Sequence, residues 1–213
     1  MKTIKLQEVK QDPQQHERLC EALREGALVC VPCRGTYRIL ADLGNKDAVT
    51  RLIQSKRRTA KAPSLVLLDA KERLKEVVAE VCPVSKALVK AYWPGPLTIL
   101  FTPHPDLPSK LVKQLVNGQG KFGVRLPADP ILASLLGEFG GPVLASSANK
   151  SQKHGESSPA QIHKTFLGHV DFFVDAGDLP QTPPSTVVDV EGGRVIVTRK
   201  GEIPEEDLRA YGA

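Results

Sequence analysis

Residues 143–151 read Val-Leu-Ala-Ser-Ser-Ala-Asn-Lys-Ser, an apolar run that passes directly into small polar residues. The pattern predicts a buried strand of an α/β sheet. Ligands of such sheets bind at the carboxyl ends of the strands, where backbone N–H groups and the side chains of Ser147 and Asn149 suit a polyanion. An ordinary Ser/Asn turn has the same composition, so this segment alone leaves both interpretations open.

Strand patterns and helix patterns alternate on both sides of this stretch. Apolar runs predict strands at 27–31, 64–68, 97–102, 123–126, 143–145, 171–174, 185–190 and 194–198. Periodic patterns predict helices at 16–26, 46–55, 70–81, 84–92, 129–139 and 160–167. The alternation predicts an α/β fold with a mixed sheet flanked by helices. No linker divides the chain, so we expect a single domain over residues 1–213 with its core at about 14–201.

The composition excludes several classes of protein. The chain has 213 residues, of which 41% are hydrophobic, and a formal net charge of +5. No apolar run approaches the roughly 18 residues of a membrane span, and the first eight residues are too polar for a secretory signal. We therefore expect a cytoplasmic protein without a membrane partner. The basic balance favours an anionic partner, while the aromatic content of 5% disfavours a stacking platform for single-stranded nucleic acid.

Cys30 and Cys33 have the C-x-x-C spacing of redox and zinc motifs. A zinc site needs a second pair of ligands, and the two other cysteines, Cys20 and Cys82, do not form one. Cys30 lies near the end of a predicted strand rather than at the start of a helix. The pattern therefore favours two reduced thiols of a cytosolic protein over metal or redox chemistry.

A basic cluster follows the predicted helix at 46–55. Lys56, Arg57 and Arg58 come directly after it, and Lys61 lies close behind. Cations at a helix C-terminus are often only solvated. A phosphate clamp also uses such residues, with Arg as a planar fork and Lys as a point charge. The spacing alone does not decide between these interpretations.

Two further arginines stand at the ends of predicted strands. A buried guanidinium at Arg125 needs an anionic partner, which is either a carboxylate of the protein or a carboxylate of a ligand. The same two alternatives apply to Arg199. The chain has neither the phosphate-loop nor the dinucleotide glycine motif, and none of its histidines has the setting of a general base. Ser, Asn, Lys and Arg without a base suit chemistry by positioning and charge neutralisation, such as attack on an activated phosphate.

Six short segments follow one another between residues 56 and 201. They are Lys56-x-Arg58, Tyr92-Trp-Pro-Gly-Pro-Leu-Thr98, Gly123-Val-Arg-Leu-Pro127, Ser147-Ala-Asn-x-Ser151, Ser185-Thr-Val-Val-Asp189 and Arg199-x-Gly201. In combination they resemble the YrdC-like family of threonylcarbamoyl-AMP synthases, from about Glu21 to Gly201. The resemblance implies a twisted open α/β sheet around a large basic cavity.

The resemblance also implies a reaction. The family joins L-threonine, bicarbonate and ATP into threonylcarbamoyl-adenylate and releases pyrophosphate. The magnesium ion is carried in with ATP, so no protein metal site is expected. A downstream threonylcarbamoyl transferase then modifies adenosine 37 of tRNA, and family members are also described as binding tRNA and double-stranded RNA. Attack of threonine carbamate on the α-phosphate, with cations absorbing the charge of the leaving pyrophosphate, suits the basic residues above.

Individual positions of this chain match the family's site residues. The implied ATP-binding set is Lys56, Arg58, Ser147, Asn149, Ser158 and Arg199. Lys56 and Arg58 of this set are the catalytic candidates. The implied threonine-binding set is Gly35, Arg125, Ala145 and Ser185. Arg125 is the expected partner of the threonine carboxylate.

The chain departs from the family pattern at several positions around the expected threonine site. Gly35 stands where the family has a threonine, Ala62 where it has Lys or Asn, and Leu67 where it often has His. Two hypotheses therefore stay open. The favoured one is the synthase, and the alternative is a catalytically altered paralogue that binds double-stranded RNA or tRNA. Formation of the adenylate distinguishes them.

Overall fold

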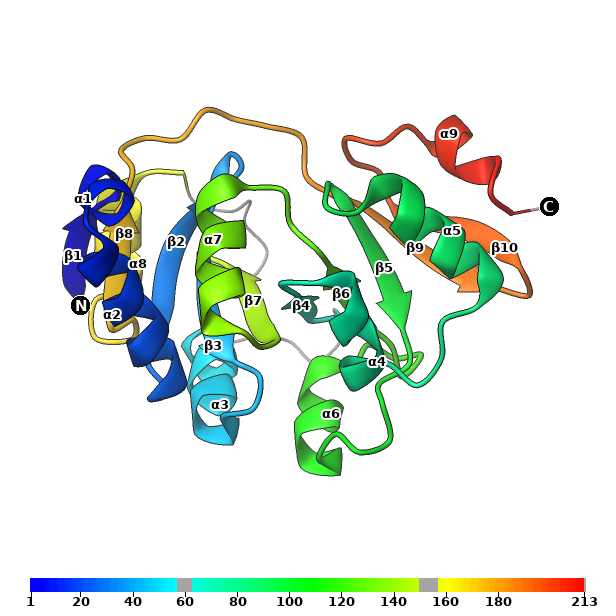
Figure 1. Ribbon diagram of the computed structural model, residues 1–213, viewed down its shortest axis with the longest axis horizontal. Coiled ribbons are helices and arrows are strands. Elements are labelled where there is room, and N and C mark those ends of the chain that lie inside the picture. Colours follow the sequence, from blue (N-terminus) through cyan, green and yellow to red (C-terminus); the bar gives the residue numbers. More distant parts are fainter. Residues whose placement is uncertain (57–62, 150–156, 213) are drawn as a thin grey trace. The chain divides into compact units, whose positions relative to one another are not determined.

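The apolar runs form strands and the periodic segments form helices, arranged in two α/β units (Figure 1). The computed structural model describes residues 1–56, 63–149 and 157–212. One unit comprises Met1–Thr59 and Asp129–Thr182, and the other comprises Ala60–Ala128 and Pro183–Ala213. Strands and helices alternate in both units, which confirms the predicted α/β class. The single domain and the basic cavity stay predictions.

The first unit has a five-stranded mixed sheet in the order β1-β8-β2-β3-β7. Its strands are β1 (Lys2–Lys5), β2 (Val29–Cys33), β3 (Thr36–Asp42), β7 (Val143–Ser147) and β8 (Phe172–Asp175). Its helices are α1 (Leu6–Gln11), α2 (Pro13–Arg24), α3 (Lys46–Ser55), α7 (Pro130–Phe139) and α8 (Pro159–Phe166). β1 and β2 run parallel to β8, whereas β3 runs antiparallel to both β2 and β7. The sheet therefore presents the end of β7 beside the start of β3.

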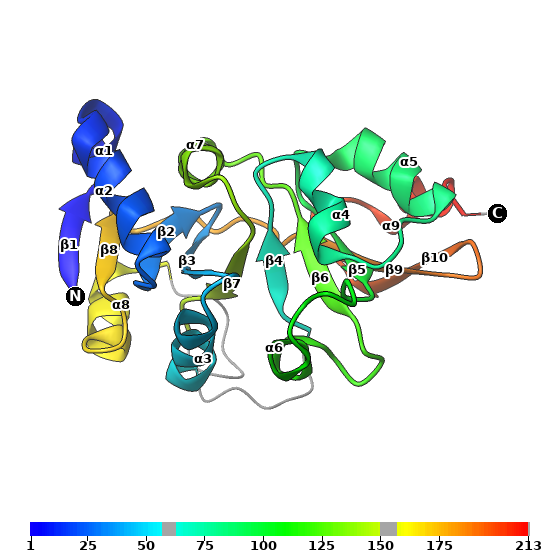
Figure 2. The same ribbon diagram turned by 60° about the horizontal axis from the view of Figure 1, so that its bottom comes forward.

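Helices cover both faces of this sheet, with α1, α2 and α7 on one face and α3 and α8 on the other (Figure 2). Local sequence explains where two of them begin. Asp12 caps α2 by accepting a hydrogen bond from Gln14 N at 2.9 Å, and Asp129 caps α7 in the same way through Leu132 N at 3.4 Å. Each helix has proline in its first turn, where no backbone donor is needed. The two capped helices pack against each other and against β2.

The second unit has a mixed sheet in the order β4-β6-β5-β9-β10. Its strands are β4 (Leu65–Leu67), β5 (Leu97–Phe101), β6 (Phe122–Arg125), β9 (Thr186–Glu191) and β10 (Arg194–Arg199). Its helices are the 3-10 turn η1 (Lys71–Arg73), α4 (Leu74–Val77), α5 (Pro83–Tyr92), α6 (Ser109–Leu115) and α9 (Glu205–Arg209). Helices α4 and α5 lie on one face of the strands and α6 on the other (Figure 2).

The motif at residues 92–98 forms the turn that joins α5 to β5. Trp93 is buried and its Nε1 donates to Leu97 O at 2.8 Å, while Gly95 N donates to Leu126 O at 2.9 Å. The first bond joins the two ends of the turn, and the second connects the turn to the residue that follows β6. The motif therefore positions β5 and its side chain Thr98.

The predicted helix at 70–81 is wrong in extent. Only a 3-10 turn and a single helical turn form, and the helix ends at Val77. Val78 is extended and bridges Pro103, and Ala79 N donates to Thr102 O at 3.0 Å. Two β-branched residues in a row favour extended backbone, and strand-like pairing with residues 102–103 satisfies their backbone groups.

Five elements were not predicted from the sequence: β1, α1, β3, α6 and α9. Strand β3 is the important omission, because it pairs with both β2 and β7 and so lies inside the sheet. Arg38 interrupts its apolar run, which hides the strand from a pattern search. In the described part of the chain, no helix is both long and apolar enough to span a membrane.

Candidate functional site

The first cluster of predicted site residues lies where α3 and β7 end. Lys56 is only 6% exposed, and its Nζ donates to Asn149 Oδ1 at 2.9 Å and to Ser147 O. Ser147 Oγ donates to the same Asn149 Oδ1 at 2.5 Å. A buried ammonium needs such acceptors, because burial of an unpaired charge is costly. Both acceptors are neutral oxygens. These two hydrogen bonds therefore position the Lys56 ammonium but do not neutralise its positive charge.

Strand pairing holds this cluster in place. Ser147 lies opposite Arg38 of β3, and Ala148 N donates to Tyr37 O at 2.8 Å. Ala145, a predicted threonine contact, is buried in β7 opposite Leu40. The predicted strand at residues 143–145 is thus confirmed, but it extends to Ser147, so Ser147 belongs to the strand and only Asn149 follows it.

Tyr37 ties the start of β3 to a loop near residue 177. Its hydroxyl donates to Gly177 O at 2.7 Å and accepts from Ala176 N at 2.9 Å. The ring is fully buried and packs against Phe173 with centroids 5.1 Å apart. Sequence analysis did not select this residue, although it positions the backbone that meets Ala148.

We expect stability to fall as the pH rises from about 10 to about 12, partly because of Tyr37. Burial raises the pKa of Tyr37 from 10.0 to about 12, so the folded protein keeps the phenol proton where the unfolded chain has lost it. This contribution is complete below pH 10 and disappears as the pH passes through the folded-state value. Denaturant unfolding at several pH values should show a shallower decrease for Tyr37→Phe. Identical slopes for the two proteins would contradict this assignment.

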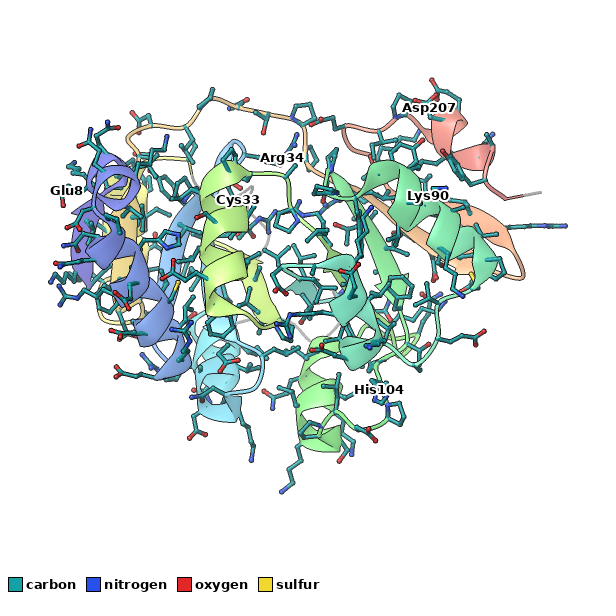
Figure 3. The ribbon with its side chains drawn as sticks, in the orientation of Figure 1. Glu8, Cys33, Arg34, Lys90, His104 and Asp207 are labelled. Carbon is teal, nitrogen blue, oxygen red and sulfur yellow. The ribbon has the colours of Figure 1, made fainter. Side chains whose placement is uncertain are left out.

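Gly35 lies in the two-residue turn between β2 and β3, beside Cys33 and Arg34 (Figure 3). Gly35 N donates to Thr182 Oγ1 at 2.8 Å. A Cβ at Gly35 would lie 2.5 Å from Pro180 O and 2.6 Å from Thr182 N, so only glycine fits. Gly35 was predicted to contact the substrate threonine. The hydroxyl of Thr182, a residue far away in the sequence, lies next to it. No sequence signal pointed to Thr182.

Ser158 and Arg58 complete the predicted ATP contacts of this part of the chain. Ser158 is the N-cap residue of α8, and its carbonyl oxygen accepts from Ile162 N at 3.1 Å. Arg58 lies outside the described residues, as do Lys61 and Ala62. The structure therefore brings Lys56, Ser147 and Asn149 together and leaves Arg58 as a prediction.

The second cluster lies in the other unit, around Ser185. Arg199 Nη2 donates to Ser185 O at 2.7 Å and to Ser185 Oγ at 2.9 Å, and Arg199 Nε reaches the same carbonyl oxygen at 3.2 Å. Thr98 Oγ1 is 3.1 Å from Ser185 Oγ. A Cβ at Gly201 would collide with Pro184 O and Thr186 N, so this chain reversal also requires glycine. The predicted ATP residue Arg199 and the predicted threonine residue Ser185 are thus hydrogen-bonded to each other.

Arg125 ends β6 of the same unit and is 1% exposed. Its carbonyl oxygen accepts from Leu68 N at 3.0 Å, and Arg125 pairs with Leu67 of β4. The planar fork of a guanidinium suits recognition of a planar anion. Leu67, one of the positions predicted to depart from the family pattern, is buried in β4 as part of the core.

The C-x-x-C segment lies inside β2 rather than at a helix start. Both cysteines are buried, and about 3.3 Å of rise per residue puts their Cα atoms about 10 Å apart, beyond the reach of a disulfide. Burial raises the pKa of the Cys30 thiol, while the nearby charge of Lys56 acts in the opposite direction. None of the four cysteines, all within the described residues, forms a disulfide. The interpretation as reduced thiols is confirmed for this pair.

The comparison with known proteins agrees with the motifs. The family model of Sua5, YciO and YrdC proteins, described as telomere recombination, matches residues 21–201. A threonylcarbamoyl-AMP synthase of Pyrococcus abyssi is 29% identical over 186 residues, which cover 87% of this chain and 54% of the relative. The chain therefore spans about half the length of that protein. A threonylcarbamoyl-AMP synthase of Methylococcus capsulatus is 31% identical over 176 residues, 82% of this chain and 92% of the relative.

Solved structures agree at the level of the fold. P. abyssi Sua5 complexed with L-threonine has a TM-score of 0.83 and 27% identity, covering 94% of this chain and 58% of its own. E. coli YciO has a TM-score of 0.80 and 23% identity, covering 92% and 93%, and supports the fold alone. The family match, the fold and the two clusters of motif residues agree: this chain belongs to the Sua5/YciO/YrdC family.

Proposed function

We propose that the protein forms threonylcarbamoyl-adenylate from L-threonine, bicarbonate and ATP and releases pyrophosphate. The buried cluster of Lys56, Ser147 and Asn149 at the end of β7 carries this proposal. Its residues are those that the family motif assigns to the nucleotide, and relatives at 29–31% identity are named threonylcarbamoyl-AMP synthases. The position of the cluster, at the carboxyl end of a strand, is where α/β sheets bind ligands.

In the proposed reaction, an oxygen of threonine carbamate attacks the α-phosphate of ATP and the bond to the leaving pyrophosphate breaks. Lys56 supplies a positive charge whose position its hydrogen bonds fix in advance. A preorganised charge stabilises the transition state without the cost of reorienting solvent. Arg58 is proposed as a second phosphate contact, with Ser158 and Arg199 as further nucleotide contacts. Mg²⁺ enters with ATP.

The threonine half of the proposal uses Arg125 for the carboxylate, Ala145 through its backbone, and Ser185. The solved complex of P. abyssi Sua5 with L-threonine supports threonine as the amino acid. Gly35 contributes no side chain to this half, but Thr182 places a hydroxyl beside it. The altered turn is therefore compatible with a polar contact at this position.

We further propose that the product serves a downstream threonylcarbamoyl transferase acting on tRNA, in the cytoplasm. The net charge of +5 suits a partner rich in phosphate. The alternative function is binding of tRNA or double-stranded RNA without catalysis, and it predicts that no threonylcarbamoyl-adenylate forms.

Pyrophosphate release by the purified protein tests the proposal directly. ATP, bicarbonate and Mg²⁺ are supplied with and without L-threonine, and we expect release that depends on both threonine and bicarbonate. Serine in place of threonine is the control for the amino acid. Absence of threonine-dependent release, together with RNA binding that weakens as salt increases, would favour the RNA-binding alternative.

A further inference from the structure

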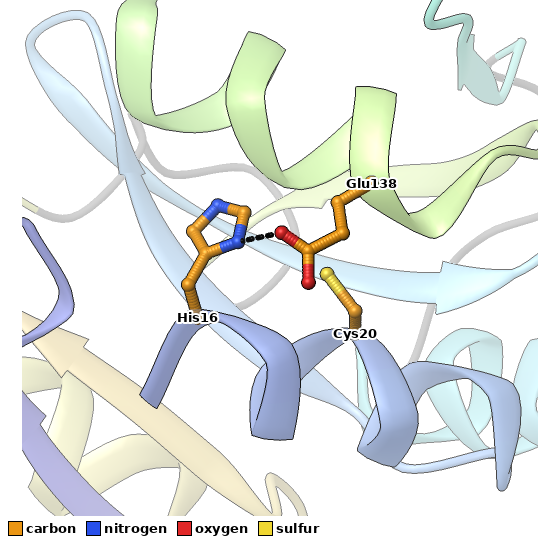
Figure 4. Close-up of side chains that lie close together, drawn as sticks. All are labelled: His16, Cys20 and Glu138. Atoms are coloured by element: carbon orange, nitrogen blue, oxygen red, sulfur yellow. Dashed lines mark hydrogen bonds and ion pairs between the residues drawn. The ribbon is translucent and has the colours of Figure 1, made fainter. Parts of the chain in front are cut away.

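A further group of side chains that could bind a ligand lies in the first unit, between α2 and α7 (Figure 4). His16 Nδ1 is 2.5 Å from Glu138 Oε2, and Cys20 Sγ points to the same carboxylate. One ligand atom from each of the three residues lies within 4.8 Å of the other two. The reaction proposed above uses none of them.

The helix geometry explains why these three residues meet. His16 and Cys20 are four residues apart on α2, so their side chains project from the same face of that helix. That face packs against α7, which contributes Glu138. Cys20 Sγ is 3.6 Å from Leu135 O, one helical turn before Glu138. His16 is 8% exposed and Cys20 is fully buried, so packing on both helices holds the group in place.

We propose that His16, Cys20 and Glu138 bind a zinc ion, with the fourth ligand a water molecule on the side of an adjoining cleft. Imidazole, thiolate and carboxylate are the three protein ligands that Zn²⁺ accepts, and three of them with an open position form a common coordination set. The thiolate selects Zn²⁺ over Mg²⁺ or Ca²⁺, which prefer oxygen ligands.

The geometry needs only a small adjustment to receive the ion. Ligand bonds of about 2.1 Å at a tetrahedral centre put the nitrogen and oxygen ligands about 3.4 Å apart, whereas His16 Nδ1 and Glu138 Oε2 are 2.5 Å apart. His16 Nε2 has no hydrogen-bond partner in the described part of the chain, so a small rotation of the ring breaks no other bond. Glu138 is 42% exposed at its side chain and is free to follow.

An adjoining cleft supplies the open position. It has a volume of about 620 Å³, and both His16 and Glu138 line it, together with Pro13 and Ser134. Glu17 and Lys10 also line the cleft and carry opposite charges. Arg24 binds the main-chain oxygen of Glu138 at 2.6 Å and leaves its carboxylate to the cluster. The cleft therefore gives solvent a route to the proposed metal position.

Binding of Co²⁺ to the purified full chain tests this proposal, because a cobalt–thiolate bond has its own charge-transfer absorption in the near ultraviolet. After dialysis against a chelator, we expect the absorption to saturate at one Co²⁺ per chain and to be abolished by Zn²⁺. Cys20→Ser should remove the band, whereas Cys82→Ser, a cysteine of the other unit, should keep it. Absence of the band in wild type, or its persistence in Cys20→Ser, would overturn the proposal.

Zinc affinity measured by calorimetry tests the other two ligands. His16→Gln and Glu138→Gln should each weaken binding by at least about tenfold, the scale on which even supporting residues of metal sites act. His104→Gln is the matched control, because His104 Nδ1 lies 3.6 Å from Asp106 Oδ2 in the other unit. Among the described residues, this pair belongs to no group of three possible metal ligands. Equal affinities in wild type and both ligand variants would show that His16 and Glu138 only join the two helices. Neither measurement depends on pyrophosphate release, so this proposal and the proposed function fail independently.

Discussion

Replacing Lys56 with methionine is expected to lower threonine-dependent pyrophosphate release by about 10²–10³-fold, the usual cost of removing one preorganised charge or donor from a transition state. Methionine keeps the length and most of the volume of the side chain but removes the ammonium that contacts Asn149 and Ser147. The substitution should therefore leave the packing at the end of α3 nearly unchanged. The rate at saturating ATP and threonine is the measurement.

Lys46→Met is the matched control for this variant. Lys46 is the first residue of the same helix and is exposed, so its loss changes the net charge equally without touching the cluster. We expect a wild-type rate for it. Thermal unfolding of both variants separates a loss of activity from a loss of fold. A folded Lys56→Met protein with the wild-type rate would show that Lys56 has only a structural role.

Introducing at Gly35 the threonine that the motif resemblance predicts there is expected to destabilise the protein. A Cβ there would lie within 2.8 Å of three atoms, Pro180 O, Thr182 N and Thr182 Oγ1. Overpacking against backbone and loss of the Gly35–Thr182 hydrogen bond together predict a decrease of about 2–4 kcal/mol in the free energy of unfolding for Gly35→Thr. Denaturant unfolding measures this decrease.

Two further variants show whether backbone or side chain causes the strain. Gly118→Thr places the same side chain where nothing lies within 4 Å, and it should be nearly neutral. Gly35→Thr combined with Thr182→Ala removes one of the three close atoms, so we expect it to recover less than half of the lost stability. Full recovery would mean that the backbone of residues 180–182 moves aside easily, and that the turn has room for the family residue.

Local sequence predicted most of the elements, because caps and periodicity act over a few residues. The helix at 46–55 was predicted with the bounds that the structure has, since Asn45 caps it through Asp47 N and Ala48 N. Strand β1 was missed because Lys2–Lys5 is polar and exists through its pairing with β8. Such a strand has no local signal, and only its partner stabilises it.

The motif residues stay predicted site residues, and the sequence did not predict which of them contact one another. The sequence placed Ser147 and Asn149 after a strand, whereas Ser147 is the last residue of β7. The structure adds the buried Lys56, 93 positions before Asn149, as their partner. It likewise pairs Arg199 with Ser185, which the motifs had assigned to different substrates. Side chains of the same cluster lie on different strands and helices, so no local spacing reveals which of them meet.

Family, α/β class and the identity of the candidate nucleotide residues were readable from the amino-acid sequence, because motifs and periodicity are local properties of the chain. The packing of α2 on α7 and the closure of residues 180–182 over the β2–β3 turn were decided only in the folded protein. His16 meets Glu138 across 122 positions, and Gly35 meets Thr182 across 147. Hydrogen bonds require atoms about 3 Å apart, and for residues so distant in the chain only tertiary packing brings them that close.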